Sequence, residues 1–397
     1  MYNDSHVSEM TTSPSFKLDQ VNKFLLHKQC LAAPTQDSDL ARTVEELGGL
    51  HATGATTPYL SLWARRRSFA KEELQGALHD ERSLGKVLCM RNTLFILPKN
   101  LLPTAYQATK KRREALLNSW LRHRGLTRPE YERSTAAIRE RLGNAAKTAA
   151  QIRRELDDPS LAGLVDFMPN DWQLIRGRPR GTWRSNLYEY NAFEAWFSDV
   201  DLESLTVEEA QVKLVQHYLS HLGPATEEDI VWWTGLGKQE IRQALALMRG
   251  QLMEIEIEGL RDSHLLLTKD LNELESSYQS ERSTFFLPSL DPYIMGYKDR
   301  RRFLDQVRHE QVFDRAGNAL PTVWFDGEVI GVWLEDSKKP GIEIFLFEDA
   351  DKRILTELDA EAQRLARFLE HDPPNVQIIL YPDGAYPKSP FTLAPKN

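Results

Sequence analysis

Helical and strand-like segments follow one another in the same order along the first part of the chain. Residues 18–31 and 40–47 carry apolar side chains at helical spacing. Residues 87–97 then predict two strands, with Arg91 and Asn92 near the bend between them. Helices followed by a short hairpin are typical of a winged helix, so we expect one here.

The same order recurs twice. In the second repeat we expect a long basic helix at 106–124, two further helices at 128–142 and 149–156, and a hairpin within 161–190. In the third repeat we expect three helices at 208–221, 227–233 and 238–248, joined by glycine-containing turns. Two strands follow, at 253–257 and 264–268. Helix, turn and helix with glycine in the turn is a geometry that reads DNA, although the last of these helices is poor in Lys and Arg.

The C-terminal part predicts mixed helices and strands, with Asp326-Gly327 as a hairpin turn. We therefore expect an α+β fold of three tandem winged-helix units and a C-terminal mixed α/β region. We expect a flexible tail at 1–16, followed by winged helix 1 with the candidate active-site segment at 17–103. A basic winged helix 2 is expected at 104–200, winged helix 3 at 201–283, and the C-terminal region with its hairpin at 284–397.

Composition narrows the class of protein. The 397 residues are 41% hydrophobic and 27% charged, which is typical of a globular chain with two or three domains. The sequence contains no apolar run of membrane-spanning length, and the polar start does not resemble a signal peptide. The two cysteines, Cys30 and Cys89, support neither a disulfide framework nor a zinc cluster. We expect a cytoplasmic, nucleoid-associated monomer.

Charge is unevenly distributed, although the net charge is −8. Residues 104–190 contain 17 Lys and Arg against 10 Asp and Glu, whereas residues 198–290 contain 7 against 17. A basic middle segment can attract nucleic acid despite a negative total, because phosphate responds to the local field. Solvated helix faces remain the alternative explanation.

Candidate chemistry centres on the segment that follows residues 40–47. Phosphate-loop, dinucleotide-binding, zinc-protease and nucleophile-elbow motifs are all absent, so no cofactor or metal is expected. His51 and Thr53 are separated by one small residue, and in an extended segment they would face one pocket together. His51, with a reference pKa of about 6.5, could accept a proton from a water that Thr53 holds. The alternative is a packing histidine without catalytic function.

Basic side chains supply candidate DNA contacts. Arg176, Arg178, Arg180 and Arg184 surround Trp183 in a predicted hairpin tip, which we expect to be mobile and suited to phosphate or groove contact. Further candidates are Arg65, Arg91, Lys298 and Arg300. Trp232 and Trp233 are expected to be core residues rather than a stacking platform.

Several pieces, in this order, resemble the AlkZ/YcaQ-type winged-helix DNA glycosylases. They include Gly48-Gly49-Leu50, Leu62-Trp63-Ala64-Arg65, Met90-Arg91-Asn92-Thr93-Leu94, Trp233-Thr234-Gly235-Leu236, Pro288-Ser289-Leu290-Asp291-Pro292-Tyr293 and Gly331-Val332-Trp333. The resemblance implies a C-shaped protein around a DNA channel that hydrolyses the N-glycosidic bond of alkylated purines, including bulky adducts. It also implies a catalytic pair, Gln-x-Gln or Gln-x-Asp, at the positions where this chain has His51 and Thr53.

Two functions follow from these patterns. The first is a monofunctional glycosylase for bulky N7-guanine adducts in double-stranded DNA, acting in base excision repair or in self-resistance to a genotoxic antibiotic. The second is a winged-helix protein without catalysis, either a lesion binder or a transcription regulator. The changed pair, His51 and Thr53, distinguishes them, because only a glycosylase should depend on it.

Overall fold

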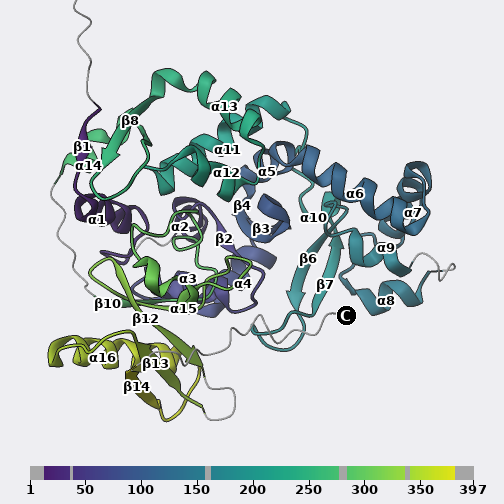
Figure 1. Ribbon diagram of the computed structural model, residues 1–397. Helices are drawn as coiled ribbons and strands as arrows, with labels where there is room; N and C mark the ends of the chain where they lie inside the picture. Colours follow the sequence, from purple (N-terminus) through teal and green to yellow (C-terminus); the bar gives the residue numbers. More distant parts are fainter. Residues whose placement is uncertain (1–12, 36–38, 157–161, 277–283, 336–339, 381–397) are drawn as a thin grey trace, which may run out of the picture.

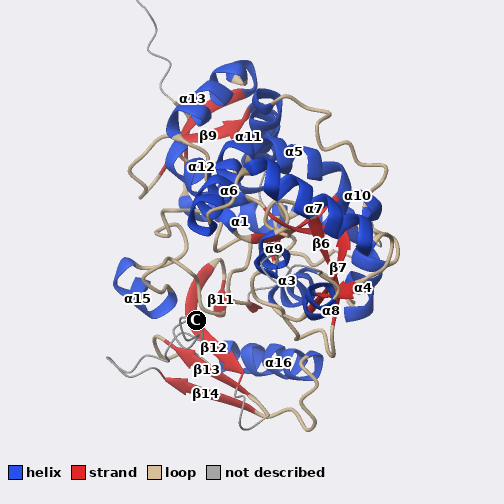
Figure 2. Ribbon diagram, turned by 90° about the vertical axis from the view of Figure 1, so that its right-hand side faces the viewer, coloured by secondary structure: helices blue, strands red, loops and turns tan. Residues whose placement is uncertain are grey.

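The computed structural model describes residues 13–35, 39–156, 162–276, 284–335 and 340–380. The described residues form four sheets, with helices around them (Figure 1). The helices of residues 110–167 project at one end, and the C-terminal sheet with the helix of residues 352–368 lies at another (Figures 1 and 2). The described part of the chain contains no helix that is both long and apolar enough to span a bilayer.

The first repeat surrounds a three-stranded sheet of order β2-β4-β3. Its helices and strands are α1 (Leu18–Lys28), α2 (Leu40–Glu46), β2 (Leu50–His51), α3 (Thr57–Arg65), α4 (Lys71–His79), β3 (Leu84–Leu88) and β4 (Leu94–Pro98). Asp39 caps α2 by accepting a hydrogen bond from the Arg42 N–H, and Gly48 and Gly49 follow the helix with positive φ. This turn leads the chain into β2 beside the middle strand.

The second repeat has a hydrophobic core of its own, built around Leu121, Tyr131 and Phe167. Its elements are α5 (Leu102–Ala108), α6 (Lys110–Arg124), α7 (Arg128–Leu142), β5 (Lys147–Thr148), α8 (Ala149–Arg154), α9 (Ala162–Phe167), β6 (Leu174–Pro179), β7 (Tyr188–Ala192) and α10 (Phe193–Trp196). The long helix expected over 106–124 is present but divided: α5 ends at Ala108 and α6 begins at Lys110, with Thr109 between them. The Thr109 hydroxyl donates 2.7 Å to the Ala105 carbonyl, and such side-chain bonding competes with helical hydrogen bonds.

The third repeat matches the expected order closely. It contains α11 (Val207–Leu222), α12 (Glu227–Thr234), α13 (Lys238–Leu247), β8 (Leu252–Ile257), β9 (His264–Leu267) and α14 (Leu271–Glu275), and the short strand β1 (Ser15–Phe16) pairs with β8 in parallel. Thr206 and Thr226 form capping boxes at the starts of α11 and α12. Gly235 ends α12 in the left-handed conformation.

The C-terminal part forms a five-stranded sheet with α16 packed on it (Figure 2). The elements are β10 (Thr284–Leu287), α15 (His309–Val312), β11 (Thr322–Phe325), β12 (Glu328–Glu335), β13 (Ile342–Leu346), α16 (Lys352–Phe368) and β14 (Val376–Leu380). The predicted Asp326-Gly327 hairpin is present, with both residues at positive φ. The expected α+β class is confirmed by this mixture.

Candidate active site and nucleic-acid interface

His51 is the last residue of β2, and its side chain is buried. It pairs with Phe95 of β4, and the two rings lie with their centroids 5.2 Å apart. Only 3% of His51 is exposed. Phe95 in turn packs edge-on against Trp233 of α12, so the first and third repeats meet behind the imidazole.

Thr53 lies beyond the end of β2, and its side chain is exposed. The backbone bends after His51, so the rule that residues i and i+2 share a face does not extend to this pair. The contact between them runs through the backbone, because the Thr53 N–H donates to His51 Nδ1 at 3.5 Å. An accepting Nδ1 is unprotonated, so the neutral ring carries its hydrogen on Nε2.

Burial, and to a smaller extent the positive charge of Arg91, lower the pKa of His51 to about 3. The imidazole is therefore neutral at physiological pH. With Nδ1 occupied by the Thr53 N–H, its free group is a hydrogen-bond donor, Nε2–H. A donating Nε2–H differs from the proton-accepting role that the reference pKa suggests for His51. As a neutral hydrogen-bond donor, this group resembles the N–H of a glutamine amide.

Arg91 lies in the turn between β3 and β4, where it adopts a φ of 54°. Its guanidinium stands over the indole of Trp232, 4.7 Å from the ring centroid. Burial and the nearby Arg112 lower the pKa of Arg91 to about 10. Arg91 forms no ion pair with any described residue. It therefore places an uncompensated positive charge beside His51.

Arg300 reaches the same indole from the loop that follows β10. Its guanidinium lies 4.9 Å from the Trp232 ring centroid and 4.6 Å from that of Phe313. Nη1 donates to the Lys298 carbonyl at 2.6 Å, while Nε and Nη2 have no acceptor among the described residues. Trp233 is 3% exposed, whereas Trp232 is partly buried and packs against the core, so the expectation of a core residue holds fully for Trp233 and in part for Trp232.

Arg65 has a structural position that excludes DNA contact in this conformation. Its side chain and that of Asp291 are both fully buried, and two guanidinium nitrogens donate to the two carboxylate oxygens at 2.7 Å. Nε also donates to the Gln29 carbonyl. The expectation that Arg65 faces DNA is therefore corrected: this side chain joins α3 to the C-terminal loop.

The hairpin of β6 and β7 is anchored at its tip, contrary to the expected mobile loop. Trp183 is buried against Tyr59 and Phe368. Arg184 pairs with Glu335 at 2.8 Å and donates to the Leu369 carbonyl. The tip thus docks on the first repeat and on α16.

The other candidate basic residues already have partners or neighbours within the protein. Arg178 pairs with Asp80, Arg180 with Glu189, and Lys298 with Glu228. Arg176 is half-buried beside Tyr190 and Tyr188, and burial lowers its pKa. To contact Arg178, Arg180 or Lys298, a DNA phosphate would have to displace the carboxylate that each of them pairs with. Among the described residues, Arg91 and Arg300 have no carboxylate partner to displace.

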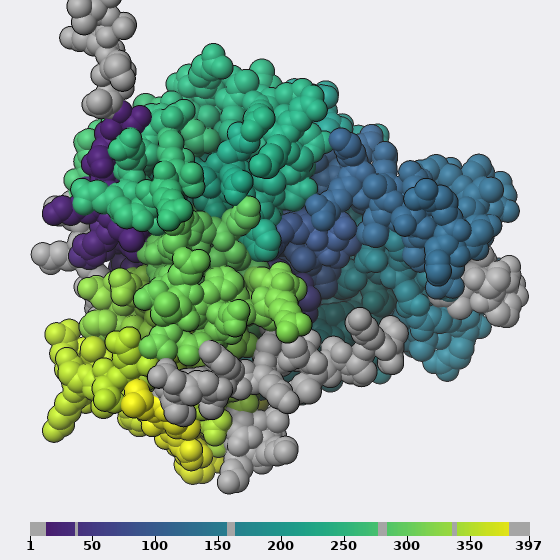
Figure 3. Space-filling view, in the orientation of Figure 1, coloured from purple at the N-terminus to yellow at the C-terminus, as the bar shows by residue number. Residues whose placement is uncertain are grey.

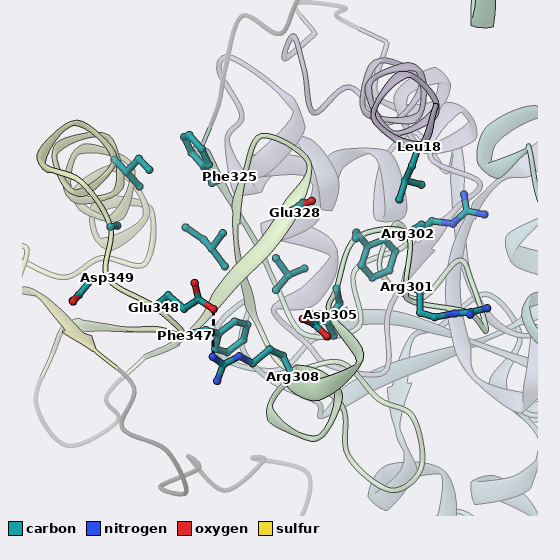
Figure 4. A pocket seen from close by; sticks show the side chains of 16 residues that line it. Leu18, Arg301, Arg302, Asp305, Arg308, Phe325, Glu328, Phe347, Glu348 and Asp349 are labelled. Carbon is teal, nitrogen blue, oxygen red and sulfur yellow. Dashed lines mark ion pairs between the residues drawn. The ribbon is translucent and has the colours of Figure 1, made fainter. Parts of the chain in front are cut away.

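The surface of the protein has two hollows (Figures 3 and 4). The surface is hollowed between the green C-terminal segment and the projecting blue helices (Figure 3). A cavity of about 490 Å³ lies elsewhere, between α1 and the C-terminal sheet, where Arg308 pairs with Glu348 (Figure 4). His51 does not line that cavity. Within the described residues, no group of three or more His, Cys, Asp or Glu side chains is arranged to hold a metal.

Comparison with known proteins places the chain in a family. The family model described as DNA glycosylase AlkZ-like matches residues 44–368, which include His51, Arg91 and Arg300. The structure of Streptomyces sahachiroi DNA glycosylase AlkZ is similar, with a TM-score of 0.76 and 23% sequence identity over 92% of this chain and 100% of that chain. No protein with a curated description matches the chain. The family match spans most of the sequence and confirms the resemblance drawn from its motifs: the chain belongs to the AlkZ-like DNA glycosylase family.

Proposed function

We propose that this protein is a monofunctional DNA glycosylase that hydrolyses the N-glycosidic bond of alkylated purines, including bulky N7-guanine adducts. The observation that carries the proposal is the family match over residues 44–368, together with a buried polar side chain, His51, at the position of the family's catalytic motif. The proposed cellular role is base excision repair or protection against a genotoxin. Three winged-helix units would surround the DNA, with His51 facing the damaged nucleotide.

The reaction needs little acid–base assistance, because an N7-alkylated guanine is cationic. When the bond between the sugar C1′ and the base N9 breaks, both electrons go to the base and neutralise it. The sugar is left with oxocarbenium character, and a water oxygen forms the new bond to C1′. The protein must hold that water and stabilise the developing positive charge with oriented dipoles.

His51 and Thr53 have the groups for this task. We propose that the Nε2–H of His51 donates to the oxygen of the attacking water. The Thr53 hydroxyl is exposed and can accept one of the water's hydrogens, and it passes the released proton to solvent. In this scheme His51 is a fixed donor, which agrees with its pKa of about 3 and with the accepting Nδ1.

The experiment is release of free base from duplex DNA containing N7-methylguanine or a bulky N7-guanine adduct. We expect release by the wild type, a loss of about 10²-fold or more in His51→Ala, and substantial recovery in His51→Gln, which keeps an N–H donor. Thr53→Ser should retain more activity than Thr53→Ala. Binding of the same duplexes should be unchanged in all four variants.

A second function, DNA binding without catalysis, is favoured by one observation: at this site the family's Gln-x-Gln or Gln-x-Asp pair is replaced by His51 and an exposed Thr53. Intact binding with no base release from either adduct would support that function and reject the glycosylase. Equal release by the wild type and His51→Ala would instead reject the role of His51.

A further inference from the structure

Three arginines from distant parts of the chain converge at the C-terminal end of α12. Arg91 comes from the turn after β3, Arg112 from α6 and Arg300 from the loop after β10. Arg112 Nη1 donates to the Gly235 carbonyl at 2.9 Å. A Cβ on Gly235 would lie 3.0 Å from both Arg112 Nη1 and the Arg91 backbone nitrogen, so the groups pack tightly around this glycine.

Carboxylates balance the charges in this cluster only in part, because Asp229 and Asp299 act on Arg300 without forming an ion pair with it. None of the three arginines forms an ion pair with a described residue. Burial and then the neighbouring positive charge lower the pKa values of Arg91 and Arg300. Crowded like charges cost free energy unless an anion joins them.

The nearest carboxylates are already occupied. Asp229 accepts hydrogen bonds from the backbone N–H groups of Lys298 and Asp299 through one oxygen, and from Thr226 through the other. Asp299 pairs with Arg301. These acids hold loops in place and leave a net positive site around Trp232.

Donor groups in the cluster lack acceptors. Four donor atoms, all buried, have no hydrogen-bond partner within the described protein: Arg91 Nε, Arg300 Nε, Arg300 Nη2 and Trp232 Nε1. The indole fixes the two guanidinium groups that stand over it, and Arg112 is exposed at the edge. Arg91 lies in the turn that leads into β4, the strand whose Phe95 packs against the His51 ring. The cluster is thus a fixed set of cationic donors next to the candidate active site.

We propose that Arg91, Arg112 and Arg300 together bind one phosphodiester of the DNA strand that carries the damaged base. The inference rests on the proposed function for the choice of DNA as the ligand. Guanidinium forks match the oxygens of a phosphate, and phosphate contacts set the register of a protein on its duplex. Binding at this point would fix the sugar of the neighbouring nucleotide relative to His51, so the three arginines are positioning residues.

The test is the salt dependence of binding to an undamaged duplex, measured by fluorescence anisotropy. The variants are Arg91→Gln, Arg112→Gln and Arg300→Gln, with Arg353→Gln on the exposed face of α16 as the matched control. Loss of one phosphate contact reduces the slope of log Kobs against log salt concentration by about 0.9. We expect a reduction of up to that size in each of the three variants and none in the control.

The double variant Arg91→Gln/Arg112→Gln distinguishes one phosphate from several. If the arginines share one phosphodiester, the double variant loses no more than about 0.9 in slope. A loss near twice that value would overturn the shared site, and unchanged slopes in Arg91→Gln and Arg112→Gln would overturn phosphate contact altogether. Arg112 is exposed, so its variant tests the proposal without disturbing a buried group.

This readout is independent of catalysis. Reduced slopes in a protein that releases no base would support the phosphate site while rejecting the glycosylase. Base release by the wild type with unchanged slopes in the variants would support the glycosylase while rejecting the site.

Discussion

Arg65 and Asp291 form a bidentate ion pair in which neither side chain is exposed. The pair joins the helix that follows His51 to the loop that carries Arg300. Ser61 donates to the same carboxylate at 2.7 Å, and the Tyr293 N–H donates at 3.0 Å. This buried carboxylate therefore helps to fix the relative positions of the two halves of the candidate site, together with the hydrogen bond from the Thr57 hydroxyl to the Ser289 carbonyl.

Removal of that carboxylate should be strongly destabilising. Asp291→Ala leaves the Arg65 charge buried without a partner, and we expect the free energy of unfolding to fall by about 3–5 kcal/mol. Denaturant unfolding of the wild type and the variant measures this loss of free energy. The control is Asp80→Ala, which removes the exposed partner of Arg178 and should cost less than about 1 kcal/mol. Equal losses in the two variants would contradict the structural role assigned to Asp291.

The anchored hairpin tip gives a second prediction. Trp183→Ala removes a buried indole from between Tyr59 and Phe368, and such truncations cost about 3–5 kcal/mol. Leu187 of the same hairpin is 72% exposed, so Leu187→Ala should leave stability unchanged. Limited proteolysis should cut the 180–187 segment in Trp183→Ala faster than in the wild type. Wild-type cleavage there as fast as in the variant would mean that the tip is mobile after all.

Local signals predicted much of the fold. Gly235 and Asp326-Gly327 require positive φ and therefore mark ends and turns in the sequence itself. The docked position of Trp183 could not be predicted in this way, because Phe368 belongs to the C-terminal region and only tertiary packing brings the two rings together. The arginines on either side of Trp183 favour a solvated tip when the sequence is considered alone, because the sequence does not show the partners that tertiary packing brings to them.

The candidate site was predicted in part. His51 was identified from its position in a motif, but its burial and its tautomer depend on Phe95 and on a backbone bend that the alternation rule does not anticipate. The sequence favours a solvated helix face over DNA contact for Arg112, since it is one of several consecutive basic residues on a helix. Only its contact with Gly235 distinguishes it.

Gly235 offers a test of how tightly the arginine cluster is built. Its φ is +72°, and Gly259 has a similar φ of +86°, but a Cβ on Gly259 would meet nothing within 4 Å. Alanine at either position should cost about 1 kcal/mol or more of stability through the left-handed backbone. Only Gly235→Ala should also weaken binding to undamaged duplex, because it displaces Arg91 and Arg112. Equal binding by the two variants would show that the packing around Gly235 does not hold the arginines.

The pH dependence of base release follows from the state of His51. With a pKa of about 3, the imidazole stays neutral from about pH 5 to about pH 8, so its protonation does not change in that range. We expect single-turnover release of N7-methylguanine to be nearly independent of pH there. A rise in rate centred near pH 6.5 that disappears in His51→Gln would indicate a general base instead.

Buried histidines should also make the fold sensitive to acid. The pKa values of His51, His79 and His264 are lowered to about 3, 4 and 4, mainly by burial. Below pH 6.5 the unfolded chain takes up protons that the folded chain does not. The stability that these groups contribute is therefore complete above pH 6.5 and is lost as the pH falls toward 4.

His79 is the residue with which to measure this loss, because it lies away from the candidate active site and is 8% exposed. Each such histidine contributes up to about 1.4 kcal/mol per pH unit between the unfolded and folded pKa values. In His79→Gln, the decline of the unfolding free energy between about pH 6 and about pH 4.5 should be shallower by up to about that slope. His123→Gln, on the exposed side of α6, should follow the wild type, since His123 meets solvent in both states. A decline in His79→Gln as steep as in the wild type would mean that His79 is protonated within the folded protein.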